Sequence, residues 1–96
     1  NALVRHEAAY SLGQMGYSKA VDALITAMLK DTNPFVRHES AIALGVIGSE
    51  RARDALMKVL YDESVEVRES AIIALANLDY LAYSKSRSKF VKMTGG

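Results

Sequence analysis

The sequence predicts an all-α protein built as a helical-repeat solenoid of about five helices in two to three repeats. One short frame, Val-Arg followed by an acidic motif, occurs three times in the 96 residues, beginning at Val4, Val36 and Val67. The segments between these copies match as well, since 19–24 and 51–56 align at a spacing of 32 residues. A period in the low thirties with two apolar-periodic segments per unit is typical of helical-repeat arrays.

Each segment has the apolar periodicity of a helix. Small and apolar side chains of the second copy recur at a 3.6-residue period and share one face, at Val36, Ser40, Ala43, Leu44 and Ile47. The segment that precedes this copy behaves in the same way. In chain order, the expected helices span residues 2–15, 18–29, 34–47, 50–61 and 65–81.

The breaks between these helices have local causes. Gly16 and Gly48 stand where helices are expected to end in a left-handed cap. An Asp-Thr-Asn-Pro turn stops the second helix, and its Pro34 suits the first turn of the third. Gly13 and Gly45 lie inside helices, where glycine costs roughly 1 kcal/mol relative to alanine. We therefore expect a neighbouring helix to approach closely at these two glycines.

Composition bounds the class of protein. Half of the residues are hydrophobic, but no stretch is long and apolar enough for a membrane span, and no N-terminal stretch has the form of a signal peptide. The absence of cysteine excludes disulfides and thiolate metal sites. It also agrees with a reducing compartment, so we expect a cytoplasmic protein that binds no membrane.

The net charge of +1 is unevenly distributed along the chain. Residues 84–96 carry four of the twelve basic residues and no acidic one, so residues 1–83 hold eight basic and all eleven acidic residues. We expect a repeat domain over 1–83 and a basic, disordered tail over 84–96. The tail does not favour a nucleic-acid partner, because it lacks stacking aromatics and a basic fold face.

The His-Glu doublets are the candidate functional residues. The two histidines of the chain are His6 and His38, each followed by a glutamate, Glu7 or Glu39, and the third copy of the frame lacks the doublet. Equivalent helices of stacked repeats lie about 8–10 Å apart, so both doublets can converge on one point. Two imidazoles and a carboxylate form the ligand set of non-haem Fe(II) oxygenases, and such a set also suits zinc. The simplest assignment makes His6, His38 and Glu39 metal ligands. Glu7, the candidate catalytic carboxylate, would bridge to the metal, orient a water or face a second metal.

A purely structural interpretation of the same residues stays open. An acidic residue early in a helix is favoured by the helix dipole, and a duplicated repeat also duplicates its histidine. No metal would then be bound. The pairs Asp31–Arg37 and Asp62–Arg68 are interpreted as stacking contacts between repeats. There is no Gly-rich phosphate loop and no nucleophile motif.

Three segments resemble the deoxyhypusine hydroxylase family. Residues 5–15, Arg-His-Glu-Ala-Ala-Tyr-Ser-Leu-Gly-Gln-Met, are similar to the start of one of its half-domains. Residues 33–45 resemble its second His-Glu helix, and the Val-Arg-Glu-Ser at 67–70 resembles the helix that follows and carries no ligand. The similarity covers roughly residues 3–81, and much of it is shared with other HEAT-like repeats, including those of phycobilin lyases.

This resemblance implies a fold, an activity and partners. The family is built of HEAT-like repeats in two similar halves, each with two His-Glu doublets, and is a di-iron monooxygenase. Its substrate is deoxyhypusine, a modified lysine on translation initiation factor 5A. By resemblance, His6, His38 and Glu39 bind one iron, with Glu7 beside it, and the rest of the site comes from a second half-domain or a homodimer. The alternatives are a non-catalytic HEAT-like scaffold for protein–protein interaction and a HEAT protein of the phycobilin-lyase type.

Overall fold

The computed structural model describes the backbone of residues 2–94 and the side chains of residues 16–89 and of Lys92. This part of the chain forms five helical elements and no strand: α1 (Ala2–Lys30), α2 (Pro34–Ile47), the 3-10 helix η1 (Glu50–Ala52), α3 (Arg53–Val59) and α4 (Val65–Thr94). The predicted all-α, helical-repeat fold is confirmed.

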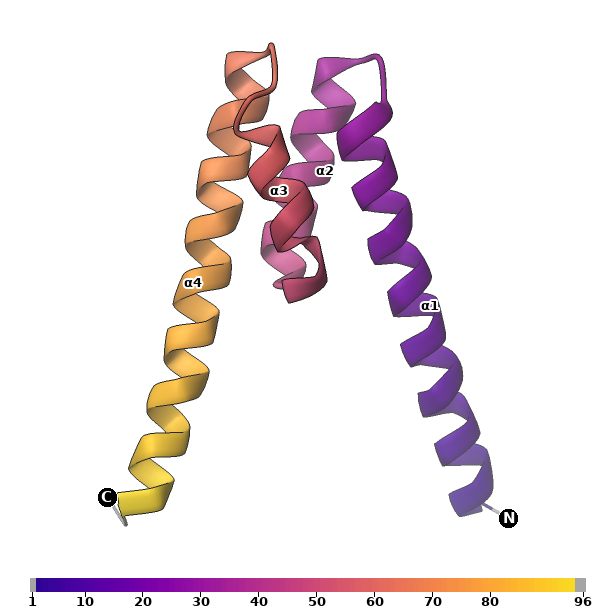
Figure 1. Cartoon of the computed structure of the whole chain (residues 1–96). Helices are drawn as coiled ribbons and strands as arrows, with labels where there is room; N and C mark the ends of the chain where they lie inside the picture. Colours follow the sequence, from indigo (N-terminus) through magenta and orange to yellow (C-terminus); the bar gives the residue numbers. More distant parts are fainter. Residues whose placement is uncertain (1, 95–96) are drawn as a thin grey trace.

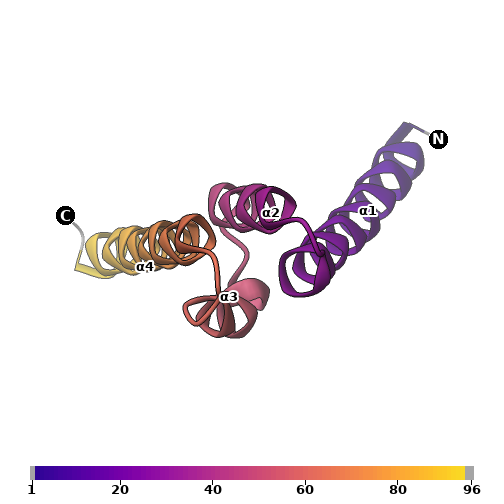
Figure 2. The same cartoon turned by 90° about the horizontal axis from the view of Figure 1, so that it is seen from above.

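The helices form two successive antiparallel pairs (Figure 1). α2 packs against α1 on one side and against α4 on the other, while α3 packs against α4. Seen from above, α2 and α4 lie next to each other and α3 lies to one side of both (Figure 2). The outer ends of α1 and α4 extend beyond this packed body on the same side and diverge from each other (Figure 1).

One apolar core joins the four α-helices. Each of them contributes a large side chain with no more than 1% of its surface exposed, namely Met28, Leu44, Leu56 and Leu78. Full burial of such a side chain is worth about 1.5–3 kcal/mol. The pairs therefore share a core, as expected for stacked repeats, in which each unit buries its apolar face against its neighbour.

The limits of α2 agree with the expected limits of 34–47, and each has a visible cause. The side-chain oxygen of Asn33 accepts a hydrogen bond from the amide of Phe35 at 2.9 Å, and Pro34 occupies the first helical turn. At the other end, Gly48 has φ 75°, and its amide donates to the carbonyl of Leu44 at 3.0 Å. This is the left-handed cap that the sequence predicted.

The close approach predicted at Gly45 is also confirmed. A Cβ built on Gly45 would lie 2.7 Å from the Cα of Ala74 in α4, where no real side-chain atom fits. The side-chain amide of Asn77 donates to the carbonyl of Gly45 at 2.6 Å in the same region. α2 and α4 therefore touch backbone to backbone. The equivalent expectation for Gly13 lies outside the described side chains.

The expected break between residues 15 and 18 is wrong. α1 runs continuously from Ala2 to Lys30, and Gly16 lies inside it with no atom of another residue near the position of a Cβ. Residues 16–20 are all exposed. Without a packing partner at this point, a turn would lose helical hydrogen bonds and gain nothing, whereas a glycine within the helix costs only about 1 kcal/mol.

Two further boundaries differ from expectation. The helix expected at 50–61 divides into η1 and α3 and ends at Val59, while the helix expected at 65–81 continues to Thr94. Residues 84–94 thus belong to α4, and they contain neither glycine nor proline, the two residues that most weaken a helix. The domain limit at residue 83 stays a prediction. No helix in the described part of the chain is long and apolar enough to cross a bilayer.

Candidate functional site

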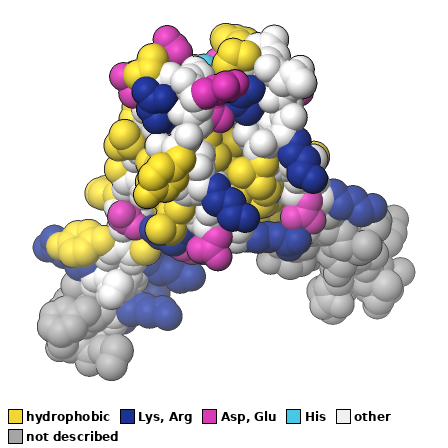
Figure 3. Space-filling model, turned by 45° about the horizontal axis from the view of Figure 1, so that its top comes forward, with side chains coloured by type: hydrophobic (Ala, Val, Ile, Leu, Met, Phe, Trp, Pro, Cys, Tyr) yellow, Lys and Arg dark blue, Asp and Glu magenta, His cyan; other side chains and the backbone are white. Residues whose placement is uncertain are grey.

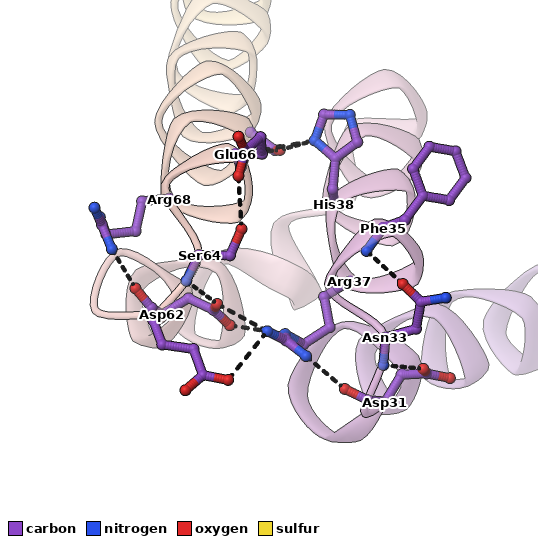
Figure 4. A network of polar contacts seen from close by, with 11 residues as sticks. Asp31, Asn33, Phe35, Arg37, His38, Asp62, Ser64, Glu66 and Arg68 are labelled. Carbon is purple, nitrogen blue, oxygen red and sulfur yellow. Dashed lines mark hydrogen bonds and ion pairs between the residues drawn. The ribbon is translucent and has the colours of Figure 1, made fainter.

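His38 lies near the start of α2 and points toward α4 (Figure 4). Its Nδ1 is 2.5 Å from the hydroxyl oxygen of Ser70 and 3.4 Å from the backbone carbonyl of Glu66, both in α4. The hydroxyl of Ser70 donates to that same carbonyl at 2.5 Å. One edge of the imidazole is therefore fixed by the neighbouring repeat.

The other edge of the imidazole faces the second member of the doublet. Nε2 of His38 lies 3.8 Å from Oε1 of Glu39. The two side chains are 29% and 54% exposed, so both donor atoms can be reached from solvent. The structure thus brings together one nitrogen and one carboxylate donor from the second doublet.

A shallow pocket of about 300 Å³ opens next to His38, and its lining includes Phe35, Ser64 and Glu66. The ring centroids of Phe35 and His38 are 6.2 Å apart. The backbone amide of Glu66 and the hydroxyl of Ser64, which donates to its carboxylate at 3.0 Å, hold the pKa of Glu66 below its usual value. Because this carboxylate is ionised, the pocket favours a positively charged occupant.

Arg37, the residue before His38, binds the next repeat (Figure 4). Its guanidinium donates to both carboxylate oxygens of Asp62, at 3.0 and 3.1 Å, and to the carbonyl of Asp31 at 2.8 Å. Arg68 donates to the carbonyl of Asp62 in the same way, at 2.7 Å. These contacts agree with the stacking role predicted for the Asp31–Arg37 and Asp62–Arg68 pairs, and the contact between repeats is that of Arg37 with Asp62. They hold the helix that carries His38 and Glu39 but include neither residue.

The pKa values of this ion pair are displaced in opposite directions. Burial raises the pKa of Asp62, but hydrogen bonds from Arg37 and from the amide of Ser64 outweigh burial and leave that pKa below its usual value. The hydrogen bond to Asp62 raises the pKa of Arg37. Both groups therefore stay charged near neutral pH, and Asp62 is not available as an acid or a base.

An apolar groove of about 470 Å³ runs between α2 and α4, one helical turn beyond His38. Its walls carry exposed apolar side chains, among them Val46 at 76%, Ile73 at 67% and Tyr80 at 64% exposure. Figure 3 shows hydrophobic side chains exposed along the side of the molecule that α4 forms, with dark blue basic side chains toward its C-terminal end. The groove offers apolar contact to whatever binds near His38.

The first doublet falls outside the described side chains. His6 and Glu7 belong to the N-terminal half of α1, whose backbone extends away from α2 (Figure 1). The expected convergence of the two doublets stays a prediction. Among residues whose side chains are described, no group of three or more His, Asp or Glu side chains could hold a metal.

Sequence reasoning missed Ser70. The sequence predicted no part in the site for the third copy of the frame, which begins at Val67. Ser70 of this copy is nevertheless 3% exposed and contacts His38. The available signal was a serine on the apolar face of a helix, a position where a polar side chain needs a partner.

Comparison with known proteins identifies a repeat family. A family model described as HEAT repeats matches residues 1–76. No curated protein matches the sequence.

Proposed function

Since the chain belongs to the HEAT repeat family, we propose that its repeats form one half of an iron-dependent monooxygenase that hydroxylates a deoxyhypusine side chain on translation initiation factor 5A. The observation that carries this proposal is the His-Glu doublet, which occurs at 6–7 and 38–39 and is missing from the third copy of the same frame. A repeat needs its apolar frame to fold, but it does not need the doublet. The activity, the substrate and the factor come from the resemblance to the hydroxylase family.

The donor atoms of the second doublet fit a metal ion. Nε2 of His38 and Oε1 of Glu39 are 3.8 Å apart. Metal–nitrogen and metal–carboxylate bonds are about 2.0–2.2 Å long, so one ion can reach both donors. Nδ1 of His38 is occupied by Ser70, which leaves Nε2 for the metal. Bound iron with open positions would supply the activation of dioxygen.

The equivalence of the repeats in the sequence supports His6 as the next ligand. In the α2–α4 contact His38 faces Ser70, and the position of Ser70 in the third copy is that of Glu39 in the second. If residues 2–15 packed against α2 as α2 packs against α4, His6 would face Glu39, with Glu7 next to it. This arrangement needs a bend near Gly16. Zinc suits the same ligand types.

The surroundings suit a long cationic side chain. The acidic surplus of residues 1–83 attracts a lysine-derived amine, and the ionised Glu66 lies at the pocket beside His38. The groove that starts at Ile42 offers apolar walls to methylene groups. With one pair of doublets per chain, the remaining ligands would come from a complementary half-domain or from a second copy.

The test is the metal content of untagged protein purified without chelator and reconstituted with Fe(II) under anaerobic conditions. We expect about one iron per chain in the wild type and almost none in His38→Ala, because two or three ligands leave no substitute for a lost imidazole. Glu69→Ala is the matched control, since Glu69 occupies the position of His38 in the third copy and should keep the metal. Hydroxylation of a deoxyhypusine peptide with the complementary half added would follow.

Wild-type protein that binds no iron or zinc would overturn this proposal and favour a scaffold that binds a partner protein. The exposed apolar groove between α2 and α4 is the observation in favour of that second function. A scaffold of this kind should fold and bind its partner with both histidines replaced.

A further inference from the structure

We propose that Ser70 is a positioning residue for His38: its hydroxyl, presented by the next repeat, keeps the hydrogen of the imidazole on Nδ1 and so leaves the Nε2 lone pair free for a metal ion that Glu39 also binds. The metal in this statement rests on the proposed function. The state of the imidazole does not, and it can be measured in the metal-free chain.

Counting hydrogens on Ser70 gives the direction of the contact. A serine hydroxyl has one hydrogen to donate and two lone pairs that accept. The carbonyl of Glu66, 2.5 Å away, can only accept, so the hydrogen of Ser70 points there. Toward His38, at 2.5 Å, the hydroxyl oxygen must therefore accept.

The second neighbour of Nδ1 leads to the same assignment. The carbonyl of Glu66 lies 3.4 Å from Nδ1, and it too is an acceptor. A neutral imidazole carries one hydrogen on one of its nitrogens. Acceptors lie near both nitrogens, but those at Nδ1 are within hydrogen-bond distance, at 2.5 and 3.4 Å, whereas Oε1 of Glu39 is 3.8 Å from Nε2. The hydrogen therefore resides on Nδ1, and Nε2 keeps its lone pair.

The fold holds this contact in place. Ser70 is 3% exposed and belongs to the face of α4 that meets α2. The contact of Gly45 with Ala74 holds α2 against α4, and Arg37 of α2 pairs with Asp62 in the loop that leads into α4. The orientation of the imidazole is thus a property of two stacked repeats.

This role explains why the third copy of the frame departs from the first two. Where the first two copies carry Glu7 and Glu39, the third carries Ser70. A carboxylate at position 70 would have no hydrogen to give to the carbonyl of Glu66 and would lie buried beside it. A small hydroxyl satisfies both the carbonyl and the imidazole. Metal-binding histidines usually donate their other N–H to such a neighbour, and loss of that neighbour weakens metal binding by about 10–100-fold.

The test is long-range ¹H–¹⁵N NMR of the full chain, labelled with ¹⁵N and free of metal, at a mildly alkaline pH of about 8.5. Only two histidines contribute signals, and His38→Ala assigns them. We expect His38 to show a protonated Nδ1 and an unprotonated Nε2. In Ser70→Ala, His38 should shift toward the Nε2–H form that free imidazoles prefer, while the signals of His6 stay in place.

Two variants separate positioning from packing. Ser40→Ala removes an equally buried serine of α2, at 5% exposure, and should leave the imidazole unchanged. Ser70→Thr retains the hydroxyl and should restore the wild-type pattern. Circular dichroism of each variant reports whether the helices are intact.

Anaerobic titration with Fe(II) then connects positioning with metal. Ser70→Ala should bind Fe(II) about 10–100-fold more weakly than the wild type, with Ser40→Ala and Ser70→Thr close to the wild type. An Nε2–H form of His38 in the wild type, or a pattern that Ser70→Ala leaves unchanged, would overturn the inference. The predicted pattern together with no Fe(II) binding in the wild type would uphold the role of Ser70 and refute the proposed function alone.

Discussion

At the scale of single residues, the contact between Arg37 and Asp62 links one repeat to the next. Arg37 is 6% exposed, and its guanidinium binds a carbonyl of its own repeat and the carboxylate of the following one. A charged side chain this deeply buried needs such partners. The pair thereby fixes the position of the neighbouring His38 relative to α4.

Replacing Asp62 by asparagine should destabilise the fold by about 2 kcal/mol at pH 7, because the charged hydrogen bonds to Arg37 are lost. The folded-state pKa of Asp62 lies below the usual aspartate value of 3.8, because Arg37 and the amide of Ser64 donate to its carboxylate. The stabilisation is therefore complete above pH 3.8 and disappears as the pH falls through the folded-state value. Urea unfolding of wild type and Asp62→Asn between pH 7 and pH 2 should show curves that converge in acid.

The matched control for this prediction is Asp22→Asn. Asp22 pairs with Arg51 at 2.7 Å, but both side chains are more than half exposed. Solvent screens such a pair, so this change should cost less than about 1 kcal/mol. An equal loss of unfolding free energy in Asp62→Asn and Asp22→Asn would mean that burial adds nothing to the Arg37–Asp62 contact.

At the scale of elements, two glycines show how packing decides what one residue type does. Gly45 is required where α2 and α4 touch, because a Cβ would lie 2.7 Å from the Cα of Ala74. Gly16 lies in an exposed stretch of α1 with open space around it. Alanine has the better helix propensity at both sites. Only at Gly45 does a neighbouring helix leave no room for its Cβ.

Alanine substitutions at these glycines should have opposite effects on stability. Gly45→Ala should destabilise the protein by about 1–3 kcal/mol, since the backbone of α4 must move. Gly16→Ala should stabilise α1 by up to about 1 kcal/mol. Chemical unfolding followed by circular dichroism measures both, and a stabilising Gly45→Ala would contradict the close contact between α2 and α4.

At the scale of the whole molecule, stability is concentrated in the packed body. The four large buried side chains come from the middle of the chain, between Met28 and Leu78. Beyond Leu78, each described side chain is exposed, although Leu81 still lies against Gly48. The last part of α4 therefore adds helix without adding core.

A chain that ends at Tyr83 should consequently unfold at the same temperature as the full chain, within about 2 °C. Its helical signal per molecule should be smaller because the end of α4 is missing. A chain that ends at Asn77 lacks Leu78 and should unfold roughly 10 °C lower. Thermal circular dichroism compares the three chains. A much lower unfolding temperature for the chain that ends at Tyr83 would show that residues 84–96 belong to the domain.

The sequence by itself determined the class of fold, the limits of α2, its left-handed cap at Gly48 and the glycine contact at Gly45. Those features depend on near neighbours or on a periodic pattern: an Asn-Pro start, a glycine end and apolar residues at helical spacing. The 3.8 Å approach of His38 to Glu39 is also local, since the two residues are adjacent in the chain, while their binding of one metal ion stays a proposal.

Tertiary structure alone decided that α1 continues through Gly16, that α4 reaches Thr94, and that His38 is held by Ser70. A glycine ends a helix only where other contacts compensate the lost hydrogen bonds, and the sequence around Gly16 does not say whether such contacts exist. The partner of a side chain in the next repeat depends on how two helices stack. For the same reason, the position of His6 relative to His38 depends on how the N-terminal half of α1 packs, which no local pattern encodes.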